Sequence, residues 1–287
     1  NITKELARKI QYLSTHNNYS MKILLAFLFL SFTAMRQQQP TGVKKTIMAV
    51  FAHPDDEAVT NVSALLARYA REGHSVYLVI ATKGELGTNK HAAIPAGDSL
   101  AKVRAGEAGC ASKALGIESP ILLGLDDGSL AKGFTQEPVH IKLDSVFKKY
   151  QPDIIITWGP DGGYGHMDHR TVHTTVTDLF QSGDMPANTK LYYTGMPTYM
   201  VKQWTENKTG KIWMYNHWNM VDDKYLTTKI KCSKEDMNKA VTALYCHWSQ
   251  FKKEDMEETS RWMRTTNDTV YLRPFLPVAK ISYDLLP

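Results

Sequence analysis

Two short segments of the chain carry the residue types that hydrolytic metal sites use. The first, residues 52–57, reads AHPDDE and places one imidazole and three carboxylates within five residues. Three carboxylates this close repel one another unless a cation is present or some of them are buried with shifted pKa values. A divalent metal ion removes that conflict, so the segment is expected to lie at a metal site.

The second segment, residues 159–169, reads GPDGGYGHMDH. Its four glycines allow the backbone to bend tightly and to approach a ligand. His166, Asp168 and His169 then add two imidazoles and a carboxylate. Two histidines and one carboxylate with an open position suit catalytic Zn²⁺, and the same set suits non-haem Fe²⁺, so the ligands alone leave the metal open. The remaining ionisable groups are those that general acid–base catalysis requires.

The hydropathy pattern predicts elements that would bring these segments together. Short apolar runs predict buried strands, each followed by a helical pattern. Strands are expected at 46–52, 75–81, 120–124, 153–158 and 190–195, and helices at 56–72, 98–115, 138–150, 166–180 and 233–251. This alternation indicates an α/β fold with a Rossmann-like, doubly wound, mostly parallel sheet. Because both motifs follow strands, they would meet at the carboxyl edge of the sheet.

A leader is expected before the catalytic part of the chain. Residues 1–40 hold four of the five net positive charges, since they contain five basic residues and one acid. From Met21, one lysine and a twelve-residue apolar run are typical of a secretory signal and too short for a membrane span. We expect an exported protein that starts at Met21, with residues 1–20 as upstream sequence. A buried or amphipathic N-terminal helix and residual membrane anchoring are the alternatives.

Residues 41–287 are expected to form a single domain with a C-terminal irregular lobe at about 199–225. Without the leader the net charge is only +1, from 29 basic and 28 acidic side chains, and no nucleic-acid-binding motif is present. Nucleic acid is therefore not an expected partner. Three cysteines do not make a disulfide framework, and Cys232 is not expected to pair with Cys246. Four aromatic side chains of the lobe could stack on sugar rings or form its own small core, namely Trp204, Trp213, Tyr215 and Trp218.

The two motifs together resemble those of the PIG-L / LmbE-like family of zinc-dependent N-deacetylases. The resemblance covers roughly residues 44–196 and, more weakly, 239–250. Further stretches fit the family pattern, namely TKGELG from Thr82, RAGE from Arg104, LDDG from Leu125 and HWSQ from His247. Met167 stands where the family usually has proline. That departure concerns backbone stiffness rather than a ligand.

The resemblance implies a metal centre and a base. His53, Asp56 and His169 would bind Zn²⁺. Asp55 would be the general base on the metal-bound water.

The resemblance also implies supporting roles at the site. His166, oriented by Asp168, would act as electrophile or as acid to the leaving amine. Tyr164 would polarise the amide carbonyl or hold the oxyanion. Arg104 would reach a substrate hydroxyl or the acyl region. Two further residues are candidates for substrate contact or for support of the ligands, namely Glu85 and Asp127.

The expected reaction is removal of an acetyl group from an N-acetylated sugar or glycoconjugate of the N-acetylglucosamine type. The partner is then a small molecule, and the sequence does not indicate an oligomeric state. An amidase that cleaves a larger acyl group, such as a thiol-conjugate amidase, is the first alternative. A non-catalytic carbohydrate-binding or metal-storage protein is the second. That protein would have a degenerate site, whereas every implied ligand and the base are present here.

Overall fold

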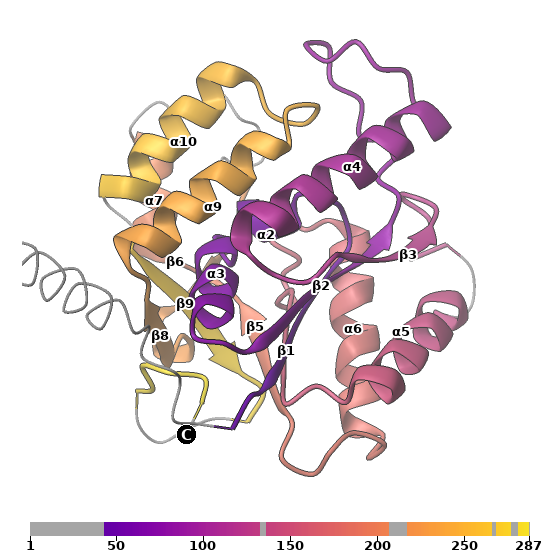
Figure 1. Cartoon of the computed structure of the whole chain (residues 1–287), viewed down its shortest axis with the longest axis vertical. Coiled ribbons are helices and arrows are strands. Elements are labelled where there is room, and N and C mark those ends of the chain that lie inside the picture. The colour runs from indigo at the N-terminus through magenta and orange to yellow at the C-terminus, as the bar shows by residue number, and fades with distance from the viewer. Residues whose placement is uncertain (1–42, 133–135, 207–216, 266–267, 277–280, 287) are drawn as a thin grey trace, which may run out of the picture. The chain divides into compact units, whose positions relative to one another are not determined.

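A seven-stranded sheet with helices on both faces is the frame of the structure (Figure 1). This computed structural model describes residues 43–132, 136–206, 217–265, 268–276 and 281–286. The strands are β1 (Thr46–Phe51), β2 (Ser75–Thr82), β3 (Ile121–Leu125), β4 (Ile154–Thr157), β5 (Lys190–Thr194), β8 (Thr228–Lys231) and β9 (Thr269–Pro274). Their order is β3-β2-β1-β4-β5-β9-β8.

The first five strands of the chain are parallel to one another, whereas β9 runs antiparallel to both β5 and β8. The expected α/β fold with a doubly wound, mostly parallel sheet is therefore confirmed. The helices are α2 (Asp56–Val59), α3 (Ser63–Arg71), α4 (Asp98–Leu115), α5 (Glu137–Tyr150), α6 (Met167–Gln181), α7 (Thr198–Glu206), α9 (Lys234–Cys246) and α10 (Lys253–Thr265). A separate parallel pair, β6 (Met196–Pro197) with β7 (Met220–Val221), and a 3₁₀ turn, η1 (Asp223–Tyr225), complete the described elements.

Both faces of the sheet are buried, which explains why its strands are unbroken apolar runs. On β1, Ile47, Ala49 and Phe51 join the core that contains residues of α3, α4 and α9. Met48 and Val50 belong to the opposite core, with residues of α5 and α6. Burial of each large aliphatic side chain contributes about 1.5–3 kcal/mol to folding. Parallel strands covered on both sides carry no polar alternation.

Two of the predicted helices have different bounds in the structure. The helix expected at 56–72 is split into α2 and α3, because Asn61 adopts the left-handed conformation with φ 60°. The helix expected at 233–251 begins as predicted, with a capping box between Ser233 and Asp236, but ends at Cys246. The residues that follow leave the helix and enter the candidate site. The sequence pattern did not predict β8, β9 or α10.

Several of the predicted features fall outside the described residues. These include the leader at 1–40 and, in the lobe, the side chain of Trp204 together with Trp213 and Tyr215. Trp218 is described: it is 7% exposed and its ring centroid lies 6.0 Å from that of Trp158. For this residue the geometry favours a packing role. Within the described part of the chain, the helices are too short or too polar to cross a lipid bilayer.

A disulfide joins two of the helices that cover one face of the sheet. It links Cys110 on α4 to Cys246 at the end of α9, 136 residues apart in the chain, and leaves Cys232 as a buried free thiol. This pair was not predicted, because nothing in the local sequence around either cysteine indicates a partner that far away.

We expect the double variant Cys110→Ala/Cys246→Ala to lose about 2–5 kcal/mol of unfolding free energy, since a cross-link across a long loop restricts the unfolded chain. Urea unfolding with and without dithiothreitol measures this. Reductant should destabilise the wild type and leave the double variant unchanged. Three reactive thiols in non-reduced, denatured wild-type protein would contradict the disulfide, which leaves one.

Candidate metal centre

The two motifs meet where the strand order of the sheet reverses. The AHPDDE segment leaves β1, and the GPDGGYGHMDH segment leaves β4, the parallel neighbour of β1. From β1 the chain continues to β2 and β3 on one side, and from β4 it continues to β5 on the other. Open α/β sheets bind ligands at such a switch point, outside the carboxyl ends of the strands. The expected convergence of the two segments is therefore observed.

Three atoms of the implied ligand set face one another. His53 Nδ1 lies 3.0 Å from His169 Nε2 and 3.7 Å from Asp56 Oδ1, and the latter two atoms are 3.4 Å apart. Zinc–ligand bonds of about 2.0–2.1 Å in a tetrahedron place the ligand atoms about 3.4 Å from one another. All three side chains are buried. The triangle thus has the size and donor types of one face of a tetrahedral metal site.

The orientation of His169 fixes which ring nitrogen is available. Its Nδ1 donates to the carbonyl oxygen of Gly162 at 3.1 Å, which leaves the lone pair of Nε2 directed to the centre. The ring also stacks on the indole of Trp158, with centroids 3.9 Å apart and planes 8° from parallel. Trp158 was not among the predicted site residues, because its place at the end of a buried strand marks it as core.

The two carboxylate oxygens of Asp56 have different partners: one accepts three hydrogen bonds from the protein, and the other accepts none from the described residues. Asp56 Oδ2 accepts hydrogen bonds from the main-chain N–H groups of Ala52 and His53, both at 2.9 Å, and from Trp158 Nε1 at 3.0 Å. Oδ1 is left facing the two imidazoles. Burial alone would raise the pKa of Asp56, but the neighbouring His169 and His53 hold it well below its usual range. The carboxylate is therefore ionised, as a metal ligand must be.

Carboxylates lie at both nitrogens of the His53 ring, with that of Asp56 on the Nδ1 side. Its Nε2 lies 3.1 Å from Asp127 Oδ1 and 3.5 Å from Asp168 Oδ2, although the N–H direction satisfies neither as a hydrogen bond. Burial lowers the pKa of His53, but these carboxylates and that of Asp56 outweigh it and raise the pKa well above the ordinary value. A carboxylate at the ring nitrogen that does not bind the metal fixes the orientation of a ligating histidine and increases its basicity.

Asp127 lies on the Nε2 side of His53, away from the three atoms that face one another, and Glu85 contacts Asp127. Asp127 Oδ2 accepts from the main-chain N–H of Leu86 at 3.2 Å, and the N–H of Asp127 donates to Glu85 Oε1 at 3.1 Å. Both acids are buried. Of the two roles expected for these acids, the contacts favour support of His53, although Asp127 also reaches the cavity.

Two other groupings around His53 could be considered for a metal. His53, His166 and His169 each place one nitrogen within 4.8 Å of the others, and His53, Asp127 and Asp168 place one atom each within the same limit. In the second grouping, both oxygens of Asp168 already accept main-chain N–H groups and one oxygen of Asp127 does so. The remaining oxygen of Asp127, Oδ1, faces His53 Nε2. The side of His53 that faces Asp56 is therefore the better metal position.

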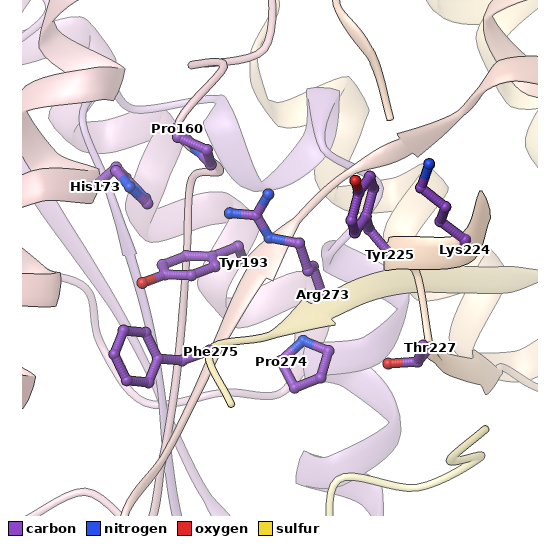
Figure 2. Close-up of a pocket in the computed structure, with 9 residues that line it drawn as sticks. All are labelled: Pro160, His173, Tyr193, Lys224, Tyr225, Thr227, Arg273, Pro274 and Phe275. Atoms are coloured by element: carbon purple, nitrogen blue, oxygen red, sulfur yellow. The ribbon is translucent and has the colours of Figure 1, made fainter. Parts of the chain in front are cut away.

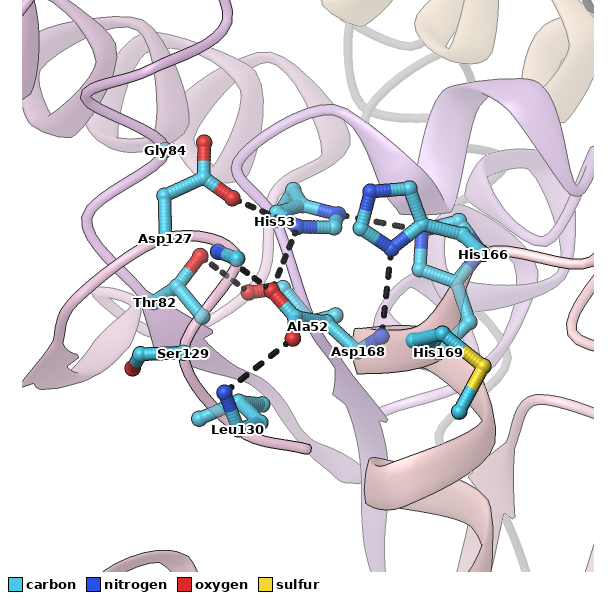
Figure 3. A network of polar contacts seen from close by, with 12 residues as sticks. Ala52, His53, Thr82, Gly84, Asp127, Ser129, Leu130, His166, Asp168 and His169 are labelled. Carbon is cyan, nitrogen blue, oxygen red and sulfur yellow. Dashed lines mark hydrogen bonds and ion pairs between the residues drawn. The ribbon is translucent and has the colours of Figure 1, made fainter. Parts of the chain in front are cut away.

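The carboxylate of Asp168 does not orient His166 as expected. It accepts hydrogen bonds from the N–H groups of Gly128, at 2.7 Å, and Leu130, at 3.2 Å, and faces His53 (Figure 3). The main-chain N–H of Asp168 donates instead to His166 Nδ1 at 3.2 Å, because His166 is the N-cap of α6. Burial and the charges of the other two histidines lower the pKa of His166 to about 4. The neutral ring then carries its proton on Nε2.

Arg104 forms an ion pair with Asp55, the expected general base. Its Nη2 lies 2.8 Å from Asp55 Oδ1 and donates to the carbonyl oxygen of Pro54 at 3.1 Å, while Nη1 donates to that of Gly84 at 2.9 Å. Gly84 has φ +65°, and a Cβ there would lie 2.3 Å from Nη1, so this approach requires glycine. Burial raises the pKa of Asp55, and the charge of Arg104 opposes the rise. Sequence reasoning assigned Arg104 to substrate. In the structure its guanidinium contacts Asp55, the expected base, and it also lines the cavity described next.

A cavity of about 150 Å³ opens beside these groups. Tyr164 lines it, with its ring edge against His166 and His169 at centroid distances of 5.8 and 5.4 Å. Gln250 and Phe251 line it from the segment after α9, which sequence reasoning noted only as a weak part of the family pattern. The other lining residues are His53, Asp55, Asp56, Val59, Gly87, Arg104, Asp127 and His166.

A fully buried ion pair stabilises the third carboxylate of the first motif. His247 Nε2 lies 2.7 Å from Glu57 Oε1, and both side chains are completely buried. Burial lowers the pKa of His247, but Glu57 outweighs it and raises that pKa. Two residues further along the chain, Ser249 donates to Glu107 on α4 from its main-chain N–H at 2.7 Å and its hydroxyl at 2.8 Å. Neither contact was predicted, because 190 and 142 residues separate the partners.

Part of the chain matches a known family. Residues 48–180 match the sequence model described as PIG-L: GlcNAc-PI de-N-acetylase. The 1D-myo-inositol 2-acetamido-2-deoxy-alpha-D-glucopyranoside deacetylase of Mycobacteroides abscessus is 32% identical over 173 residues, which cover 54% of this chain and 61% of that protein. The matched segments span about half to three fifths of the length of such curated relatives.

Solved structures with a similar fold include enzymes of two kinds. The N,N'-diacetylchitobiose deacetylase from Pyrococcus horikoshii has a TM-score of 0.61 at 18% identity. The alignment covers 88% of this chain and 92% of the deacetylase chain. GalB, the 4-carboxy-2-hydroxymuconate hydratase from Pseudomonas putida KT2440, has a TM-score of 0.55 at 16% identity, with coverage of 84% and 100%. These likenesses concern the fold, which by itself does not determine chemistry.

We expect Asp56→Asn and His169→Ala to lose bound metal, because each removes one of three ligands. Metal content per chain after dialysis against trace zinc measures this, with His140→Ala, an exposed histidine on α5, as the control. The wild type and the control should retain about one ion per chain. Full metal content in both ligand variants would refute the assigned ligand set.

Removing one partner of the buried pair should destabilise the protein strongly. We expect Glu57→Gln or His247→Gln to cost about 3–5 kcal/mol of unfolding free energy, because each leaves a buried group without its partner. The double variant should cost at least about 1 kcal/mol less than the sum of the single changes. Urea unfolding of all four proteins measures this coupling. Simple additivity would show that the two side chains do not act as a pair.

Proposed function

We propose, from the match of residues 48–180 to the PIG-L family model, that this protein is a metal-dependent hydrolase that removes the acetyl group from an N-acetylated sugar or glycoconjugate of the N-acetylglucosamine type. The observation that carries the proposal is the convergence of His53 Nδ1, Asp56 Oδ1 and His169 Nε2 beside Asp55. The name of the mycobacterial relative, a deacetylase of a 2-acetamido sugar, supports the substrate class.

Zn²⁺ is the proposed ion, held by His53, Asp56 and His169. Two imidazoles and one carboxylate with an open position are a donor set that catalytic zinc uses, and Fe²⁺ is the second candidate. When bound, the ion supplies a Lewis acid and lowers the pKa of coordinated water toward neutrality. The crowded carboxylates of the first motif favour a cation at this point.

The remaining side chains provide the acid–base and polar contacts for amide hydrolysis. Asp55 accepts the proton of the attacking water, and Arg104 keeps its carboxylate turned to the cavity. Because His166 accepts a main-chain N–H at Nδ1, its Nε2–H is available to donate a hydrogen bond to the oxygen that becomes negative. This favours the electrophile role for His166 over the acid role. Tyr164 lines the same cavity, and we propose that its hydroxyl contacts the same oxygen.

The size of the cavity bears on the acyl group. About 150 Å³ is below the roughly 300–1,000 Å³ of typical small-molecule sites. Such a space favours an acetyl group over the longer chain of the alternative amidase. A hydratase with this fold exists, so the assay must distinguish amide hydrolysis from addition of water to a double bond.

We propose further that the protein is exported, as the apolar run after Met21 suggests. The disulfide between Cys110 and Cys246 supports this, because disulfides persist in oxidising compartments and are rare in the reducing cytosol. A fusion of residues 21–45 to a reporter that is active only after export tests it. Retention of the fused reporter in the cytosol would contradict export.

We expect Asp55→Asn to lower kcat by a factor of about 10²–10⁴, since it removes the proton acceptor, while metal content stays unchanged. Release of free amine from N-acetylglucosamine, N,N'-diacetylchitobiose and an N-acetylglucosaminyl inositol measures this. Asp126→Asn is the matched control, because Asp126 is an exposed acid on the loop next to Asp127, paired with Lys83.

N-propionyl and N-butyryl analogues of the best substrate separate the deacetylase from the larger amidase. Their kcat/KM should fall as the acyl chain lengthens. Equal turnover by wild type and Asp55→Asn would overturn the proposed mechanism, and absence of amide cleavage on the whole panel would overturn the function.

A further inference from the structure

A second pocket lies next to the candidate metal centre and shares no lining residue with the first cavity. Its volume is about 440 Å³. It is formed where β5, β9, α6 and η1 approach one another, and Figure 2 draws the nine residues that line it. Trp158 lies between the two sites. Its indole N–H donates to Asp56, and its carbonyl oxygen accepts from Nδ1 of His173, which lines the second pocket.

We propose that this pocket binds an organic oxyanion, a carboxylate or phosphate group carried on a sugar-sized ring. The volume lies within the range of roughly 300–1,000 Å³ typical of small-molecule sites. The proposal concerns a site separate from the one that hydrolyses the amide, and it does not depend on the proposed function.

The charges in the pocket favour an anion. Arg273 and Lys224 line it, and none of its nine lining residues is acidic. Lys224 is exposed and forms an ion pair with Asp222 at 3.3 Å. Arg273 is partly buried and forms no ion pair with a carboxylate of the described residues. Its charge interacts with the carboxyl group of Asp161, where burial raises the pKa and Arg273 opposes the rise without forming an ion pair. An anionic ligand would give the guanidinium a direct charged partner.

Strand pairing positions Arg273 beside Tyr193. Arg273 on β9 is directly opposite Tyr193 on β5 in the antiparallel register, so both side chains project from the same face. The guanidinium carbon lies 5.1 Å from the centre of the Tyr193 ring. Figure 2 shows it projecting between Tyr193 and Tyr225. Stacking on the ring leaves the N–H edge of the fork available for the paired oxygens of a carboxylate or phosphate.

Tyr193, whose ring the Arg273 guanidinium covers, has contacts on several sides. The hydroxyl of Tyr193 lies 2.8 Å from Thr177 Oγ1, and its ring is 4.6 Å from that of His173 and 6.4 Å from that of Phe275, between centroids. Its neighbours on α6 and at the end of β9 therefore leave Arg273 a rigid platform. A preorganised group loses little conformational entropy when a ligand binds.

The walls of the pocket suit a ring with hydroxyl groups. Tyr225, which is 51% exposed and has Lys224 Nζ over its ring at 4.9 Å from the centroid, and Phe275 are aromatic side chains of the kind that stack on sugars. Two polar atoms of the lining have no hydrogen-bond partner among the described residues, namely Thr227 Oγ1 and His173 Nε2. Burial lowers the pKa of His173, so the neutral ring can accept a hydrogen bond at Nε2. A charged ring ligand would stack on the aromatic side chains and donate a hydroxyl hydrogen bond to His173 Nε2, whereas Thr227 Oγ1 is itself buried.

Isothermal titration of the whole protein with four probes tests the proposal. The probes are glucose 6-phosphate, glucuronate, neutral glucose and inorganic phosphate. At least one of the two sugar anions should bind at one site per chain, more tightly than glucose and than inorganic phosphate. Which sugar anion binds more tightly identifies the oxyanion. Binding should persist in the Asp55→Asn protein, because that change lies in the other site.

Two variants and a control locate the site. Arg273→Gln should weaken binding of the sugar anion about tenfold or more, because it removes charge-assisted hydrogen bonds, and Arg273→Lys should weaken it less. Lys229→Gln, on β8 opposite Tyr271 of β9, removes a charge from the same sheet and should leave binding unchanged. Thermal unfolding verifies that each variant is folded. Unchanged binding in Arg273→Gln, equal affinity for glucose or inorganic phosphate, or no binding of either sugar anion would overturn the proposal.

Discussion

Three consecutive carboxylates at the end of β1 must all be accommodated inside the protein, and the arrangement of the surrounding elements follows from this constraint. Like charges so close together cannot all stay ionised in a buried site without cationic partners. The structure gives each carboxylate a partner from a different part of the chain. Arg104 on α4 pairs with Asp55, and His247, after α9, pairs with Glu57. Asp56 faces two imidazoles, and there a bound metal ion would complete the balance of charge.

The helices that carry these partners are fastened to one another. The disulfide joins α4 to the end of α9, and Glu107 on α4 accepts two hydrogen bonds from Ser249. The elements that hold the base and the buried glutamate therefore form one rigid block against the sheet. On the other face of the site, His166 is the N-cap of α6, and His169 lies in the first turn of that helix. A site built between a fixed block and a helix start keeps its side chains oriented before substrate arrives.

The parts of this arrangement that have a local signature could be predicted from the sequence. Apolar runs gave the five parallel strands, and the position of both motifs after strands gave their convergence. The pairing of Glu57 with His247 has no such signature, since it is a contact between distant residues with no shared period. For the same reason the disulfide was not foreseen. The role of Asp168 also differed, because an N-cap orients His166 through the main chain, which residue types alone do not reveal.

The geometry predicts that a metal ion binds on the Nδ1 side of His53, with Asp56 and His169 as the other protein ligands. A crystal structure of the zinc-loaded protein, with anomalous data at the zinc edge, tests this most directly. We expect one anomalous peak about 2.0–2.2 Å from His53 Nδ1, Asp56 Oδ1 and His169 Nε2. A peak on the Nε2 side of His53, between Asp127 and Asp168, would contradict it.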